Sequence, residues 1–260
     1  MPMLYDYKGI TINYNLEGTG DTLVLLHGLL EDSSMWDSLV IEFKTTHQVL
    51  TLDLPGHGNT GCLGYVHTMT DMALMLTALL KHLHIKSAKF IGHSMGGYVA
   101  LALSELHPNM VESLCLMNST YKADSEARKA LRVRAVQMAK NNYENLVHMS
   151  FSNLFAPASK RNFKTAFEAA LKVALSTPVQ GYIAAMEGMR IRPDRQDTFF
   201  NFNGPKALVL GKKDSLVDAD ILKNTLHNTA IDLCELSEGH MSHIENKYDL
   251  TYFLLRFIQK

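Results

Sequence analysis

Cysteine is scarce in this chain of 260 residues, which contains only Cys62, Cys115 and Cys234. An odd number of widely spaced cysteines does not fit the disulfide framework of a small secreted protein. We therefore expect reduced thiols in a cytoplasmic protein. Cys115 and Cys234 fall in strand-like apolar runs, so we expect them to pack in the core.

The chain also lacks an excess of charge of either sign. It has 25 basic and 26 acidic residues and a net charge of -1, which leaves no electrostatic footprint for nucleic acid or an anionic membrane. No apolar run approaches the roughly 20 residues that span a bilayer. Residues 1–6 lack the basic and apolar regions of a signal peptide. The remaining class of partner is a small molecule.

Short apolar strands alternate with amphipathic helices in the first part of the chain. Such alternation predicts a mostly parallel sheet with helices on both faces. The expected elements are a hairpin over 3–16 with its turn at Lys8-Gly9, strands over 22–26, 49–53, 89–91 and 111–117, and helices over 33–43, capped by Ser33 or Ser34, and over 69–83.

This rhythm stops after Thr120, and from about Asp124 to Asp197 the pattern is helical only. A block of that length between two strands is too long for a loop. We therefore predict a core domain formed by 1–120 and 198–260, and a helical cap inserted at 121–197. The expected elements are helices over 125–140, 159–175 and 179–189, the last begun by Thr177-Pro178 in N-cap and N1 positions, then a strand over 206–211, the segment 220–227, a strand over 231–236 and a closing helix over 247–258.

The segment Gly92-His93-Ser94-Met95-Gly96-Gly97 lies between a strand pattern and a helix pattern. A strand that turns into a helix within one residue forces that residue into a strained conformation with backbone pressed close, which the flanking glycines permit. A G-x-S-x-G match alone also occurs by chance in loops, so its context decides. Here the context predicts a nucleophile elbow with Ser94 at its tip.

A serine nucleophile needs a base and an acid that orients the base, and both are expected beyond the carboxyl ends of later strands. Asp214 follows the strand at 206–210, and His240 follows the strand at 231–236, so the chain order is Ser94, Asp214, His240. Their rivals are residues nearby in sequence. Asp218 and Asp220 are expected to cap the next helix, and His243 lies farther from its strand than His240 does.

An oxyanion hole would use two backbone N–H groups, for which we select Met95 and Leu29. Gly28 permits the close approach of the second turn. We expect structural roles for the other histidines near these motifs, His27, His57 and His93. The spacing His240-x-x-His243-x-Glu245 matches no common metal site, and we expect neither a metal nor a cofactor.

Taken together, these motifs resemble the α/β-hydrolase fold superfamily over essentially the whole chain. The resembling segments are His27-Gly28-Leu29, Asp53-Leu54-Pro55-Gly56-His57-Gly58, Gly92 to Gly97, Gly211-Lys212-Lys213-Asp214 and Gly239 to Glu245. The resemblance implies an eight-stranded sheet with its second strand antiparallel, plus a helical cap. The subgroup it looks most like is that of small bacterial serine esterases, enol-lactonases, cofactor-free haloperoxidase-like enzymes and C–C bond hydrolases. Relatives often have a proline after the glutamate near the C-terminus, where this chain has Asn246-Lys247.

We interpret the chain as a serine hydrolase of small esters or lactones. Arg190 and Arg192 in the cap offer guanidinium groups for a substrate carboxylate, but we favour solvated or ion-paired arginines, because surface arginine is common. The alternative functions are a C–C bond hydrolase, a lyase or synthase that uses the same triad, and a non-catalytic binding protein on this scaffold. The sequence specifies neither the substrate nor the oligomeric state.

Overall fold

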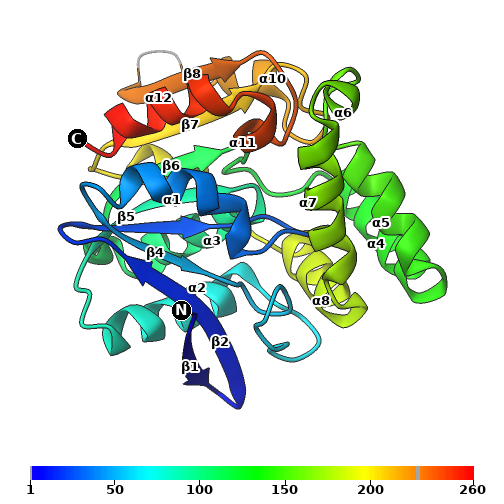
Figure 1. Cartoon of the computed structure of the whole chain (residues 1–260), viewed down its shortest axis with the longest axis horizontal. Coiled ribbons are helices and arrows are strands. Elements are labelled where there is room, and N and C mark those ends of the chain that lie inside the picture. The colour runs from blue at the N-terminus through cyan, green and yellow to red at the C-terminus, as the bar shows by residue number, and fades with distance from the viewer. Residues whose placement is uncertain (1, 227–228) are drawn as a thin grey trace.

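The structure, a computed structural model, describes residues 2–226 and 229–260 and contains one eight-stranded sheet (Figure 1). The strand order is β1-β2-β4-β3-β5-β6-β7-β8. β2 runs antiparallel to both of its neighbours, and every later pair is parallel. The strands are β1 (Met3–Tyr7), β2 (Ile10–Glu17), β3 (Thr22–Leu26), β4 (Gln48–Leu52), β5 (Ala88–His93), β6 (Val111–Met117), β7 (Lys206–Gly211) and β8 (Ile231–Leu236).

Helices cover both faces of the sheet, as the continuous apolar strands predict. Alternate residues of β3 illustrate this, because Leu23 and Leu25 pack in one buried cluster while Val24 and Leu26 pack in the other. The first cluster includes residues of α1 and α12, and the second includes residues of α2 and α3 (Figure 1). These helices are α1 (Asp37–Phe43), preceded by the 3-10 helix η1 (Ser33–Trp36), α2 (Met69–His82), α3 (Met95–Leu106) and α12 (Lys247–Phe257), and the short helices of the same part of the chain are η2 (Pro108–Met110), α10 (Ala219–Lys223) and α11 (Ser242–Glu245).

Between β6 and β7 the described chain is helical, and these helices gather at one end of the sheet (Figure 1). They are α4 (Glu126–Asn141), α5 (Tyr143–Ser152), α6 (Ser159–Asn162), α7 (Lys164–Ser176), α8 (Val179–Arg190) and α9 (Gln196–Phe200). We call α4 to α8 the inserted helices.

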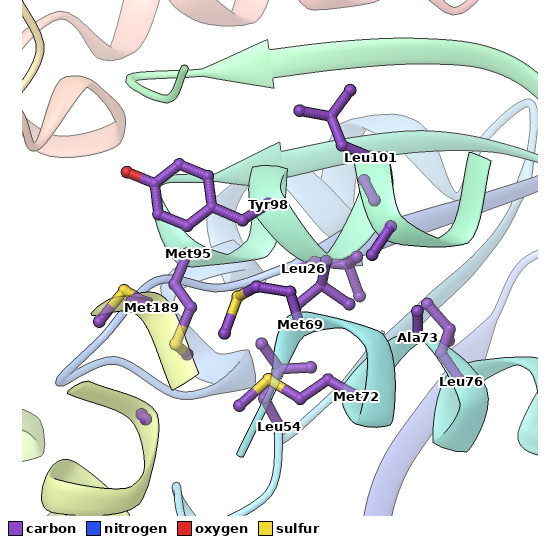
Figure 2. Packing of buried hydrophobic residues seen from close by; sticks show 14 of the residues in the cluster. Leu26, Leu54, Met69, Met72, Ala73, Leu76, Met95, Tyr98, Leu101 and Met189 are labelled. Carbon is purple, nitrogen blue, oxygen red and sulfur yellow. The ribbon is translucent and has the colours of Figure 1, made fainter. Parts of the chain in front are cut away.

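Helix α8 packs directly on the backbone of the sheet domain through two glycines. A Cβ atom at Gly181 would lie 1.9 Å from the carbonyl oxygen of Gly56, and one at Gly188 would lie 1.7 Å from that of His67. Figure 2 shows Met189 of α8 in the same buried cluster as Met95 and Tyr98 of α3. The inserted helices are therefore fixed against the end of the sheet where α3 begins.

Several details at helix ends differ from the sequence-based expectations. The cap of η1 is Asp32, which accepts a hydrogen bond from the Ser34 amide, whereas Ser33 or Ser34 was expected. Pro178, rather than Thr177, occupies the N-cap position of α8. The helix expected over 159–175 is interrupted at Phe163, which has φ -118° and ψ 36°.

Other details of the helices agree. Asp218 caps α10, as predicted, whereas Asp220 lies inside that helix. Ser125 caps α4. His227, the last residue of the expected segment 220–227, lies outside the described residues. Within the described part of the chain, no helix combines the length and apolar character needed to cross a membrane.

Candidate active site

Ser94 connects β5 directly to α3 in a strained conformation. Its φ is 51° and its ψ is -114°, a region that costs a residue with a side chain about 1–3 kcal/mol. The glycines on either side are required sterically, because a Cβ at Gly92 would lie 2.5 Å from the backbone of Gly96, and one at Gly96 would lie 2.2 Å from the carbonyl oxygen of Leu26. The local geometry is the strand–turn–helix that the sequence predicts.

Asp214 and His240 meet at the carboxyl ends of the neighbouring strands β7 and β8. The Nδ1 atom of His240 lies 2.7 Å from Oδ2 of Asp214, and both side chains are buried. The other carboxylate oxygen, Oδ1, accepts hydrogen bonds from the amides of Leu216 and Val217. Burial by itself would raise the pKa of Asp214, but the charge of His240 and its hydrogen bond outweigh burial and hold that pKa below its usual range. The carboxylate is therefore ionised at neutral pH and holds the imidazole from one side.

Two polar residues after β6 support this arrangement and were not identified from the sequence. The Asn118 amide donates hydrogen bonds to Oδ2 of Asp214, at 3.1 Å, and to the carbonyl oxygen of Gly239, at 3.2 Å. The Ser119 hydroxyl donates to the carbonyl oxygen of Ser94, at 2.7 Å. Their position directly after a buried strand was the available signal, because the carboxyl ends of parallel strands share one edge of the sheet.

The turn after β3 approaches Ser94 closely. A Cβ at Gly28 would lie 3.1 Å from that of Ser94, and Leu30 has a positive φ of 63°, which bends the chain sharply there. The amides selected from the sequence belong to Leu29 in this turn and to Met95 at the start of α3. Neither amide donates a hydrogen bond to an acceptor in residues 2–226 or 229–260. Leu29 lines the cavity described below, whereas Met95 is buried, and their role as donors to a ligand oxygen stays a prediction.

A buried ion pair lies beneath this turn and involves Glu31, which sequence reasoning missed. Its Oε2 atom accepts hydrogen bonds from the Gly28 amide, at 2.6 Å, and from Nδ1 of His93, at 2.7 Å. The Nε2 atom of His93 lies 3.0 Å from the carbonyl oxygen of His240. Because both ring nitrogens face acceptors, His93 binds its partners best as the imidazolium. Burial lowers the pKa of His93, but the charge of Glu31 outweighs it and the net shift is upward.

His243, the rival of His240, belongs to this buried cluster. Its ring packs edge-on against His93, with centroids 5.7 Å apart, and burial lowers its pKa to about 4. Donor atoms of Glu31, His93 and His243 lie within 4.8 Å of one another, so among residues 2–226 and 229–260 these three could hold a metal ion. Of these, Glu31 and His93 already form an ion pair with each other. Glu245, the third member of the His-x-x-His-x-Glu spacing, instead accepts hydrogen bonds from the amides of Ala156 and Met241.

The histidines expected to be structural make local contacts. The Nδ1 atom of His27 lies 2.7 Å from the carbonyl oxygen of Gly28, and its Nε2 accepts the Leu54 amide at 2.8 Å. Burial lowers the pKa of His57 to about 3, which keeps this side chain neutral.

A cavity of about 240 Å³ lies between the sheet edge and the inserted helices, and both Ser94 and His240 line it. His243 lies instead on a neighbouring groove. Met186 and Met189 of α8 face the cavity, whereas Met138 and Met149 are exposed, and Phe151, Phe155 and Phe167 pack on one another. The rest of the wall is mainly apolar and includes Leu29, Leu30, Tyr98, Leu146, Leu154, Tyr182 and Met241.

Arg190 and Arg192, the candidates for a substrate carboxylate, do not line this cavity. Arg190 forms an ion pair with Glu187 one turn earlier in α8. Arg192 is buried, binds Asp124 at 2.7 Å and lies over the ring of Tyr98. The structure therefore corresponds to the ion-paired alternative, because nearby carboxylates occupy both guanidinium groups. The arginines that do line the cavity are Arg128 and Arg132 of α4.

Comparisons with known proteins concern the family and the fold of this chain. The family model for the alpha/beta hydrolase fold matches residues 21–247. The chain is 24% identical to the 3-oxoadipate enol-lactonase 1 of Acinetobacter baylyi over 94% of this chain and 91% of that protein. It is 30% identical to the (E)-2-((N-methylformamido)methylene)succinate hydrolase of the same organism, in an alignment that spans 48% of each chain.

A solved structure extends the likeness to the whole fold. The thermophilic esterase from Thermogutta terrifontis matches with a TM-score of 0.92 and 24% identity, over 100% of this chain and 98% of that one. At this level of identity the likeness concerns the fold. With the family model covering most of its length, this chain belongs to the α/β-hydrolase fold family.

Proposed function

We propose that this hydrolase cleaves small carboxylic esters or lactones, with Ser94 as nucleophile, His240 as base and Asp214 as the residue that orients the base. The observation that carries the proposal is the shared cavity. Ser94, held out at a strained turn, and His240, held at 2.7 Å by Asp214, both face it.

The mechanism follows from the tautomer of His240. Because Nδ1 donates to the Asp214 carboxylate, Nε2 is the nitrogen free to accept a proton. His240 takes the proton of the Ser94 hydroxyl as Oγ attacks the carbonyl carbon, and Asp214 stabilises the resulting imidazolium. The negative charge on the carbonyl oxygen would be stabilised by the amides of Leu29 and Met95.

The second half of the reaction reverses these roles. His240 gives its proton to the departing alkoxide, which leaves an ester between the acyl group and Ser94. A water molecule then loses a proton to His240 and attacks this acyl-enzyme, and the acid is released as Ser94 regains its proton. No metal or cofactor takes part in these steps.

The names of the relatives support an ester or lactone substrate over the alternatives. An enol-lactonase aligns over nearly the full length of this chain. A C–C bond hydrolase, or a lyase that uses the same three residues, is the second candidate. A non-catalytic binding role is disfavoured, because such a protein would not need a strained serine beside an oriented imidazole.

We further propose that residues 121–197 form a cap over the core domain of residues 1–120 and 198–260. The cavity supports this division, since its walls come from the strand ends on one side and from α4, α5 and α8 on the other. Two methionines of α8 face the cavity, and their flexible side chains can adapt to the contour of a substrate.

A panel of p-nitrophenyl esters from acetate to palmitate tests this function. A largely apolar cavity of about 240 Å³ should accept short acyl chains, so we expect kcat/KM to be highest for the acetate-to-hexanoate range. Ser94→Ala should reduce the rate with every ester by about 10⁴-fold or more. A maximum at palmitate would contradict the short-chain cavity, and an active Ser94→Ala variant would contradict the nucleophile.

A further inference from the structure

A buried cluster of two arginines and one carboxylate lies behind the wall of the Ser94 cavity. Asp124 forms ion pairs with both Arg132 and Arg192. All three side chains are buried, with Arg132 only 8% exposed. One carboxylate cannot neutralise two guanidinium groups, so the cluster carries an unbalanced positive charge away from water, where its field is screened weakly.

Arg132 is the member of this cluster that faces the cavity. It binds Asp124 through Nε and Nη2, while its Nη1 atom donates to the sulfur of Met186 at 3.4 Å. A thioether is a weak acceptor for a charged donor. The Nη1 group therefore has the capacity for a stronger partner in the cavity.

The cluster is connected closely to the reacting serine. Arg192 lies 4.0 Å from the ring centroid of Tyr98, and Tyr98 also lines the cavity. Tyr98 follows Ser94 by four residues, which is about one turn or 6 Å along α3. Arg132 and Ser94 line the same cavity of about 240 Å³, so an anion bound at Arg132 would share that cavity with an acyl group on Ser94.

The other charges that face this cavity do not cancel the positive charge. Half-buried Arg128, one turn before Arg132 on α4, adds a second guanidinium to the wall. The acidic residue on the wall is Glu31, and it is paired with His93. A neutral ester would leave the unbalanced charge without a partner, whereas a carboxylate would satisfy it.

We propose that Arg132, assisted by Arg128, binds a free carboxylate of the substrate, so that the preferred substrates are esters or lactones of dicarboxylic acids. The inference rests on the proposed serine hydrolase function and specifies its substrate class. It transfers the carboxylate-binding role from Arg190 and Arg192 to the arginines that face the cavity.

A matched pair of esters tests this inference, namely the mono-p-nitrophenyl ester of glutaric acid and p-nitrophenyl pentanoate. The two acyl chains have similar length, and only the first has a terminal carboxylate. We expect the wild-type protein to have a kcat/KM about 10- to 100-fold higher for the glutarate ester, the range for one charge-assisted hydrogen bond. Free glutarate should also inhibit competitively, and pentanamide, which has no carboxylate, should do so far more weakly.

Three variants assign the preference to Arg132. Arg132→Met should bring the ratio of the two kcat/KM values close to one, because it removes the guanidinium group that distinguishes the two esters. Arg132→Lys should lower the ratio several-fold, because it keeps the charge and loses the planar fork. Arg134→Met, an identical change at an exposed position of the same helix, should leave the ratio unchanged.

The inference and the function fail in different ways. Equal kcat/KM values for the two esters in the wild type, with Ser94→Ala inactive, would overturn the carboxylate site and leave the hydrolase function intact. A preference that survives in both Arg132 variants would also overturn it. If neither ester is cleaved, the proposed function fails, and calorimetric titration with glutarate then decides the site. Binding that Arg132→Met weakens about tenfold or more supports the site, and equal or absent binding overturns it.

Discussion

Replacing His240 with alanine is expected to lower kcat/KM for p-nitrophenyl butyrate by about 10⁴-fold, whereas His243→Ala should lower it by no more than about tenfold. The reason is position. His240 faces the cavity of Ser94 and is held by Asp214, whereas His243 faces a neighbouring groove and packs on His93. Loss of the first ring removes the base, and loss of the second removes only packing.

The control for this comparison is the folded state of both variants, measured by circular dichroism and thermal unfolding. Both side chains are buried, so each replacement should lower the melting temperature, and the rates are compared only if both variants remain folded. If His243→Ala were the inactive variant and His240→Ala retained most of the activity, the base would have been assigned to the wrong histidine.

Glu31→Ala is expected to lower the free energy of unfolding by about 3–5 kcal/mol, because it leaves the buried His93 imidazolium without its partner. The same change frees the Gly28 amide and loosens the turn that presents Leu29. Urea unfolding measures the effect on stability. Glu42→Ala, an exposed acidic residue of α1, is the matched control and should change stability by no more than about 0.5 kcal/mol.

The contribution of this ion pair depends on pH in a defined way. Glu31 has a lowered pKa in the folded protein, so its contribution is complete above its ordinary pKa of 4.5 and is lost as the pH falls. His93 has a raised pKa, so its contribution is complete below its ordinary pKa of 6.5 and is lost as the pH rises through the raised value. The stability difference between wild type and Glu31→Gln should therefore be largest between pH 4.5 and 6.5. A difference that is absent in this window would contradict the ion pair.

The fold could be predicted from the sequence because local patterns encode it. The central parallel strands, such as β3 and β7, are short apolar runs, and the glycines around Ser94 permit a turn that a Cβ at those positions would obstruct. The positions of Asp214 and His240 follow from the same logic, since both come directly after a strand. Their catalytic roles remain predictions, which the variants above test.

The features that could not be predicted depend on contacts between distant segments. Glu31 and His93 are separated by 62 residues, and no spacing rule connects them. Arg190 and Arg192 lie close together at the end of a helix, but the sequence does not show which way their side chains point. The ion pair of Arg192 with Asp124 joins residues that are far apart in the chain. Arg132 belongs to a helix with a mostly polar sequence, so only its tertiary position distinguishes it from its neighbour Arg134.

The most direct test of the central claim is the intact mass of the native protein after treatment with a fluorophosphonate probe. We expect a single adduct, located on Ser94 by peptide mapping, because Ser94 is held at a strained turn and shares a cavity with an oriented histidine. Ser94→Ala should show no adduct, and His240→Ala should react far more slowly. An unmodified wild-type protein, or an adduct on another residue, would contradict the assignment of Ser94 as the nucleophile.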